Sequence, residues 1–248
     1  MASTVIMVHG AFCGGWTFER LRMPFEAGFK VLTPDLPGHA DGQSASAVTG
    51  LSMSDYAREI ARLCAEQDEP PILVGHSMGG LVAQLAARRC DLKALVLLAP
   101  SPPWGVAAGT IEEAVTAFGL HMLGPFWFQA VSPDQGLARA YSFDRLPKPE
   151  RDACVARLRP ESGRALFETL NWWLDPLMTT SLGPGPLKVP SLVLAGSRDV
   201  VHSSGTVRQT AERIGGTFLE MPGMSHWLPG EQGWENVARA SLEWLSGL

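Results

Sequence analysis

Cysteines are few in this sequence of 248 residues, and no two of them form a Cys-x-x-Cys pair. The four are Cys13, Cys64, Cys90 and Cys154. No cluster of cysteine and histidine has the spacing of zinc ligands. We therefore expect free thiols, a reducing compartment such as the cytoplasm, and no metal site. No coenzyme-binding signature is present either, so no cofactor is predicted.

Long basic runs and long apolar runs are also missing. The net charge is −5 and there is no basic cluster, which argues against a nucleic-acid partner. No apolar stretch approaches the roughly 20 residues that span a bilayer. Residues 1–8 have no basic segment before their apolar part, so we expect a first strand rather than a signal peptide. The hydrophobic content of 46% is enough for one large core with an inserted subdomain.

Short apolar runs alternate with helical patterns along both ends of the chain. The runs are mostly continuous, as in strands that are buried on both faces. This alternation predicts an α/β fold with a mainly parallel sheet of about six strands flanked by helices. The predicted strands are residues 5–8, 30–33, 72–74, 94–98, 192–195 and 218–221. Tyr56, Ile60 and Cys64 share one face of a predicted helix that either Ser52 or Ser54 can cap.

The alternation stops between residues 101 and 185, where we predict helices and no clear strand. Proline and glycine flank this stretch at both ends, and large apolar side chains are frequent inside it. They are Trp104, Phe118, Met122, Phe126, Trp127, Phe128, Phe167, Trp172 and Trp173. We interpret residues 101–185 as a helical cap inserted into a core formed by residues 1–100 and 186–248. A ligand pocket is expected between cap and sheet.

The most specific motif is Gly75-His76-Ser77-Met78-Gly79, which lies between a predicted strand and a predicted helix. Its pattern is Gly-x-Ser-x-Gly, in which glycines allow the serine to sit on a sharp turn. A serine hydroxyl held at the start of a helix is typical of a nucleophile. The chain must then also provide a base, an orienting acid and oxyanion donors.

His226 is the best candidate for the base because it follows the last predicted strand, at the sheet edge where Ser77 lies. Asp199 follows the strand at 192–195 and is the candidate for the orienting acid. Asp35 also follows a strand, but we assign it a loop-fixing role through side-chain bonds to the backbone. We expect His202, although close to Asp199 in sequence, to be exposed.

Two backbone N–H groups are expected to stabilise an oxyanion. One belongs to Met78, the residue after the nucleophile, and the other to Ala11, in the loop after the first strand. Side chains around these positions and in the insertion are candidates for substrate contact. They are Phe12, His76, Trp104, Phe128 and Trp227.

These motifs together resemble the α/β-hydrolase superfamily, in particular its capped esterase- and lipase-like members. The resemblance covers nearly the whole chain, in the segments at residues 9–10, 35–39, 75–80, 196–199 and 225–226. It implies the roles given above to Ser77, Asp199 and His226. Residues 8–16 are similar to the opening of small methylesterases and of hydroxynitrile lyases. Gly10 and Trp227 occupy the positions where the lyases have threonine and lysine, which favours hydrolysis.

We therefore expect a serine hydrolase that cleaves small to medium hydrophobic esters through an acyl-enzyme. Lactone hydrolysis, carbon–carbon bond hydrolysis and perhydrolysis use the same triad and remain open, because one fold hosts many functions. An alternative outside the enzymes is a small-molecule sensor or signalling protein with little or no turnover.

Overall fold

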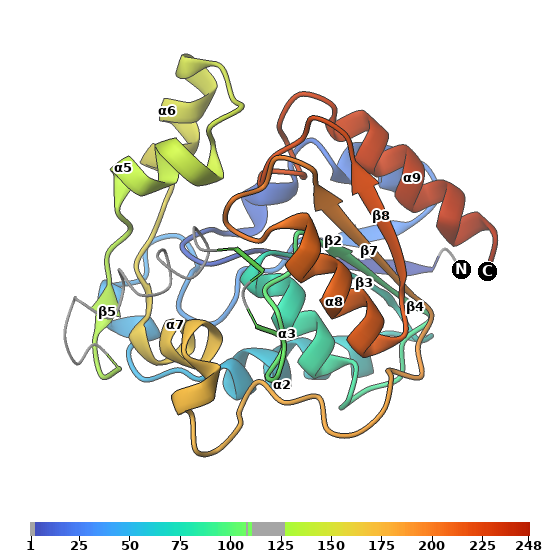
Figure 1. The fold of residues 1–248 in the computed structure, drawn as a ribbon, viewed down its shortest axis with the longest axis horizontal. Coiled ribbons are helices and arrows are strands. Elements are labelled where there is room, and N and C mark those ends of the chain that lie inside the picture. The colour runs from blue at the N-terminus through green and yellow to red at the C-terminus, as the bar shows by residue number, and fades with distance from the viewer. Residues whose placement is uncertain (1–2, 108, 111–126) are drawn as a thin grey trace.

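The computed structural model describes residues 3–107, 109–110 and 127–248. A six-stranded sheet lies at its centre, with strand order β2-β1-β3-β4-β7-β8 and every neighbouring pair parallel (Figure 1). The strands are β1 (Thr4–Val8), β2 (Lys30–Leu32), β3 (Ile72–His76), β4 (Ala94–Leu98), β7 (Ser191–Gly196) and β8 (Thr217–Met221). The predicted fold class is confirmed, and each predicted strand is present.

Helices cover both faces of the sheet, which explains the continuous apolar runs. Along β1, Ile6 and Val8 pack on one face while Val5 and Met7 pack on the other. The first face is covered by α2 (Met53–Ala65), α3 (Met78–Ala86) and α8 (Ser204–Ile214), and the second by α1 (Arg22–Glu26) and α9 (Trp234–Ser246). The central strands therefore need apolar side chains at every position.

Helix α2 begins with a capping box that resolves the choice left open by the sequence. The Ser52 hydroxyl accepts the Asp55 N–H at 3.1 Å, and the Asp55 carboxylate accepts the Ser52 N–H at 2.9 Å. Ser52 is thus the N-cap, and the bonds satisfy two donors at the helix start. The apolar face of this helix includes Tyr56 and Ile60, as its spacing predicts.

The described part of residues 101–185 is mostly helical, but it also contains a short strand pair. Strands β5 (Ala130–Val131) and β6 (Glu161–Ser162) are antiparallel, so the prediction of no strand here was wrong. Two residues per strand are too few to produce a periodicity in the sequence. The helical elements are α5 (Gln135–Leu137), the π-helix η3 (Ala138–Ser142), α6 (Lys148–Ala156), α7 (Gly163–Leu170) and η4 (Trp172–Leu174). Phe118, Met122 and Phe126 lie outside the described residues.

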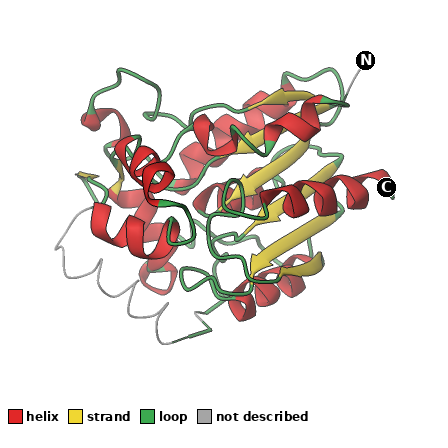
Figure 2. Cartoon of the chain, turned by 90° about the horizontal axis from the view of Figure 1, so that it is seen from above, coloured by secondary structure: helices red, strands yellow, loops and turns green. Residues whose placement is uncertain are grey.

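Two short 3-10 helices, η1 (Gly15–Phe18) and η2 (Ala45–Val48), follow β1 and β2. In Figure 2 the arrows of the sheet point towards the helices of the 101–185 segment. The loops after the strands therefore lie between the sheet and the described helices of this segment. No helix in the described part of the chain is long and apolar enough to cross a membrane.

Candidate active site

Ser77 stands on the sharp turn between β3 and α3. Its backbone has φ 54° and ψ −125°, a conformation that residues other than glycine rarely adopt. The glycines around it are required by close packing. A Cβ at position 75 would lie 2.6 Å from the Gly79 carbonyl oxygen, and one at position 79 would lie 2.2 Å from that of His9. The turn therefore places the Ser77 hydroxyl at the carboxyl edge of the sheet.

The structure brings the three predicted catalytic residues together. His226 Nε2 is 3.0 Å from Ser77 Oγ, and His226 Nδ1 is 2.8 Å from Asp199 Oδ2. The three side chains come from the loops after β3, β7 and β8, which end at the same edge of the parallel sheet. The His226 and Asp199 side chains are almost fully buried. This arrangement allows His226 to take a proton from Ser77 while Asp199 holds the imidazole in one tautomer.

Asp199 is held in its charged form by a set of donors. Burial raises the pKa of this carboxyl, but the neighbouring His226 and hydrogen bonds outweigh burial, so the pKa lies below its ordinary value. Asp199 Oδ1 accepts the N–H groups of Val201 at 2.8 Å and His202 at 3.0 Å. The second oxygen is thereby free to face His226.

Two further histidines pack behind His226. His76 Nε2 donates to the His226 carbonyl oxygen at 2.9 Å, and burial lowers the pKa of His76 to about 3. His202 was predicted to be exposed, and this was wrong. It is only 8% exposed, and its Nε2 is hydrogen-bonded to Ser101 Oγ at 2.9 Å. Burial and the neighbouring His226 lower the pKa of His202 to about 4, so both supporting rings are neutral near pH 7.

The two candidate oxyanion donors flank the serine. Neither the Ala11 N–H nor the Met78 N–H has an acceptor among the described residues. The Met78 N–H belongs to the first turn of α3, where backbone donors have no intrahelical partner. The loop after β1 approaches Ser77 closely, because a Cβ at Gly10 would lie 3.0 Å from Ser77 Cβ. Strands β1 and β3 are also neighbours at the point where the strand order reverses, which is where open α/β sheets bind ligands.

The other sequence candidates occupy different surroundings. Asp35 Oδ1 accepts the Gly15 N–H at 2.8 Å and so fixes a loop, as predicted. His76 and Trp227 are buried, and Trp227 packs against Trp16 and Phe143. The predicted contact of these two side chains with substrate stays a prediction.

The remaining substrate candidates lie nearer the insertion. Phe12 packs with Leu166 and Phe167 of α7. Trp104 stacks edge-on against Trp172 with ring centroids 5.3 Å apart, whereas Phe128 is 79% exposed. Their substrate contacts also stay predictions.

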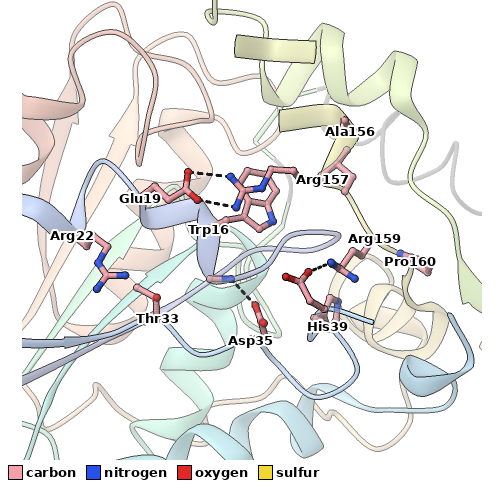
Figure 3. Close-up of a pocket in the computed structure, with 13 residues that line it drawn as sticks. Trp16, Glu19, Arg22, Thr33, Asp35, His39, Ala156, Arg157, Arg159 and Pro160 are labelled. Carbon is pink, nitrogen blue, oxygen red and sulfur yellow. Dashed lines mark hydrogen bonds and ion pairs between the residues drawn. The ribbon is translucent and has the colours of Figure 1, made fainter. Parts of the chain in front are cut away.

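A cleft of about 680 Å³ opens between the loop after β1 and the end of α6 (Figure 3). Its lining is polar and charged, and Ser77 is not part of it. Arg157 pairs with Glu19 across the cleft and lies over the Trp16 ring at 4.7 Å from the centroid. Because it lacks the nucleophile, we do not assign this cleft to the acyl-transfer site, despite its size.

Two buried glutamates near the site were missed by the sequence reasoning. Glu231 accepts the Ser225 N–H at 2.6 Å, beside His226, and burial raises the pKa of its carboxyl to about 7. Glu161, in β6, accepts the Phe12 N–H at 3.3 Å, next to Ala11. No local pattern marks Glu161, because its bonds to Phe12, His39 and Tyr56 join segments far apart in the chain.

Comparison with known proteins shows the family of this chain. The sequence pattern of the Alpha/beta hydrolase family matches residues 5–240. The chain is 35% identical over 228 residues to a pyrethroid hydrolase of Sphingobium wenxiniae, covering 86% of this chain and 76% of that protein. It is 28% identical over 257 residues to a pimeloyl-(acyl-carrier protein) methyl ester esterase of Chromobacterium violaceum, covering 96% and 94%.

Among solved structures, a methylesterase of Arabidopsis has the same fold. Its TM-score is 0.75 at 21% identity, covering 99% of this chain and 100% of that one. The sequence match spans all the strands of the sheet and the loops that carry Ser77, Asp199 and His226. The chain belongs to the alpha/beta hydrolase family.

Proposed function

We propose that the protein is a serine esterase that hydrolyses small to medium hydrophobic esters through an acyl-enzyme. The observation that carries this proposal is the continuous hydrogen-bonded chain Ser77–His226–Asp199, with distances of 3.0 and 2.8 Å. The chain is related over most of its length to proteins named as esterases and as a pyrethroid hydrolase, which supports ester substrates.

The first half of the reaction forms the acyl-enzyme. Ser77 Oγ attacks the ester carbonyl carbon while His226 Nε2 takes the hydroxyl proton, and Asp199 stabilises the imidazolium. The carbonyl oxygen gains the negative charge, and the free N–H groups of Ala11 and Met78 are the donors we assign to it. Collapse of the tetrahedral intermediate breaks the bond to the alcohol, which leaves with the proton from His226.

The second half repeats these steps with water. His226 removes a proton from a water molecule, which attacks the acyl carbon and forms a second tetrahedral intermediate. Its collapse releases the carboxylic acid and returns the proton to Ser77 Oγ. Atoms and charge balance over the cycle, since ester and water give acid and alcohol.

We assign the role of a cap to residues 101–185, with the substrate held between this segment and the strand ends. Phe12, in the loop after β1, packs against Leu166 and Phe167 of α7. This apolar cluster suits an uncharged acyl or alcohol group. Lactone hydrolysis, carbon–carbon bond hydrolysis and perhydrolysis use the same triad and would show turnover of other substrates, whereas a sensor would show binding without turnover.

A panel of esters and lactones, graded in acyl length and alcohol size, tests the proposal when combined with intact-mass detection of the acyl-enzyme. The wild-type protein should turn over esters many times. Ser77→Ala should lower kcat by roughly a million-fold, because the residual rate of triad enzymes comes from binding and oxyanion stabilisation alone. Retention of more than about a tenth of the activity in Ser77→Ala would contradict the assignment, and ligand-induced stabilisation without turnover would favour the sensor.

A further inference from the structure

The backbone of Phe12 is held in a strained conformation next to a candidate oxyanion donor. Its φ is 64°, which costs a non-glycine residue about 1–2 kcal/mol. The turn that contains it is closed by a 3.3 Å bond from the Cys13 N–H to the Gly10 carbonyl. Ala11, whose N–H faces no acceptor among the described residues, directly precedes Phe12. Whatever holds Phe12 in place therefore also orients the neighbouring peptide.

The 101–185 segment holds Phe12 from both sides. Glu161 Oε2 accepts the Phe12 N–H at 3.3 Å, and the Phe12 carbonyl oxygen accepts the Arg159 N–H at 2.8 Å. Pro160 lies between these two residues and favours an extended backbone at position 159. Figure 3 shows Arg159 and Pro160 beside the loop after β1. The loop thus gains both of its Phe12 hydrogen bonds from the insertion.

Glu161 is itself fixed by partners from two other segments and from its own strand. Its side chain is fully buried, and its Oε1 accepts the Tyr56 hydroxyl at 2.6 Å and the Ser162 N–H at 2.7 Å. Its Oε2 is 3.0 Å from His39 Nε2. A carboxylate that binds four donors with two oxygens has little freedom to turn, so it presents a fixed acceptor to Phe12.

The charge of this cluster is balanced. Burial raises the pKa of Glu161, but His39 and the other donors outweigh burial and bring it below its ordinary value. Burial lowers the pKa of His39, but Glu161 outweighs it and raises that pKa above its ordinary value. Both ring nitrogens of His39 face acceptors, the Pro37 carbonyl oxygen at 3.2 Å and Glu161 Oε2 at 3.0 Å, so both donate and the ring is an imidazolium. The ion pair that it forms with the carboxylate has no net charge and adds little repulsion to a negative oxyanion nearby.

We propose that Glu161 is a positioning residue for the oxyanion hole, acting through the Phe12 peptide to hold the Ala11 N–H towards Ser77. The inference rests on the proposed esterase function. Because Glu161 belongs to the insertion, the same contact makes a complete oxyanion site depend on docking of this segment against the core.

The test substitutes Glu161→Gln. An amide has only one acceptor oxygen, so donors that now face the carboxylate would meet an N–H group instead, and the ion pair with His39 is lost. We expect kcat for an ester to fall about ten- to a hundredfold with KM almost unchanged, since a misplaced donor weakens transition-state binding. The rate at which a fluorophosphonate labels Ser77 should fall in parallel, because phosphonylation also places a developing oxyanion in this site.

Glu168→Gln is the matched control. Glu168 is also a buried glutamate of the insertion, and it also accepts a core backbone N–H, that of Met53 at 2.8 Å. It has no bond to the loop after β1. We expect Glu168→Gln to keep kcat and the labelling rate within about threefold of wild type, even if thermal stability falls as much as in Glu161→Gln. Equal losses of labelling in both variants would overturn the proposal.

Unchanged kcat and labelling in a folded Glu161→Gln protein would also overturn it. If Glu161→Gln does not fold, Tyr56→Phe removes the 2.6 Å donor and leaves the carboxylate charge. A fluorophosphonate should label Ser77 in this variant at least about threefold more slowly than in wild type, since the Glu161 carboxylate has lost one of the donors that hold it in place. A wild-type labelling rate in Tyr56→Phe would contradict the inference. The labelling comparison needs no ester turnover, so a failed esterase assignment is distinguishable from a failed role for Glu161.

Discussion

Two buried histidine–carboxylate pairs lie in the described part of this protein, and their nitrogen–oxygen distances are nearly equal. His226 and Asp199 are 2.8 Å apart, and His39 and Glu161 are 3.0 Å apart. They differ in what the other ring nitrogen faces. His226 Nε2 faces the hydroxyl of Ser77, whereas His39 Nδ1 is 3.2 Å from the Pro37 carbonyl oxygen in its own loop. A histidine–carboxylate pair is therefore suited to catalysis or to positioning according to its third partner.

The two pairs also connect different parts of the chain. His226 and Asp199 belong to neighbouring loops of the sheet, so the core alone brings them together. His39 belongs to the core and Glu161 to the insertion, so their contact exists only when the two are docked. The comparison predicts that substitutions in the first pair affect chemistry, and that those in the second affect both docking and chemistry.

Among substitutions in the two pairs, the largest effect should come from Asp199→Asn. The asparagine keeps the shape of the side chain but favours the wrong tautomer of His226, so kcat should fall about 10⁴-fold while the protein still folds. Steady-state kinetics together with circular dichroism checks this. A loss no larger than that of Glu161→Gln would remove the distinction between the two pairs.

The second pair should give a characteristic pH dependence of stability. The raised pKa of His39 contributes stability that is present below the unfolded value of 6.5 and is lost as pH rises through the folded value. The lowered pKa of Glu161 contributes stability that is present above 4.5 and is lost as pH falls through the folded value. The difference in unfolding free energy between wild type and Glu161→Gln should therefore be largest between pH 4.5 and 6.5. Urea titrations that extend from well below pH 4.5 to well above pH 6.5 measure it, and a difference that stays constant across the whole series would show that the pair is uncharged.

The smallest effect is expected for an exposed ion pair that, like His39 and Glu161, connects the 101–185 segment to the core. Arg157 and Glu19 join the insertion to the core through two hydrogen bonds, but both side chains are largely exposed. A double-mutant cycle of Arg157→Ala and Glu19→Ala should give a coupling energy of about 0.2–1 kcal/mol, because solvent screens the pair. Urea unfolding of the four proteins tests this. A coupling above about 2 kcal/mol would mean that exposed pairs, rather than Glu161, dominate docking.

The sheet and the positions of Ser77, Asp199 and His226 were predictable because strand ends in a parallel sheet share one edge. A motif and two residues after strands were enough to place all three there. His202 was predicted wrongly because its surroundings are not local: its hydrogen-bond partner, Ser101, is far away in sequence. Glu161 was missed for the same reason, since Phe12, His39 and Tyr56 have no pattern in the sequence that relates them to it. Local sequence thus indicates the residues of the sheet edge, but not the contacts of the insertion.

The strand order has one further consequence, for the way the chain folds. Strand β4 pairs with β3 on one side and with β7 on the other, and the whole insertion separates β4 from β7 in sequence. During synthesis from the N-terminus, one edge of a fully apolar strand therefore has no partner until residue 191 and beyond have been made. Unpaired apolar edges template aggregation, and pairing across such a long separation is slow. The late strand β7 thus extends the nascent sheet and at the same time covers the unpaired edge of β4.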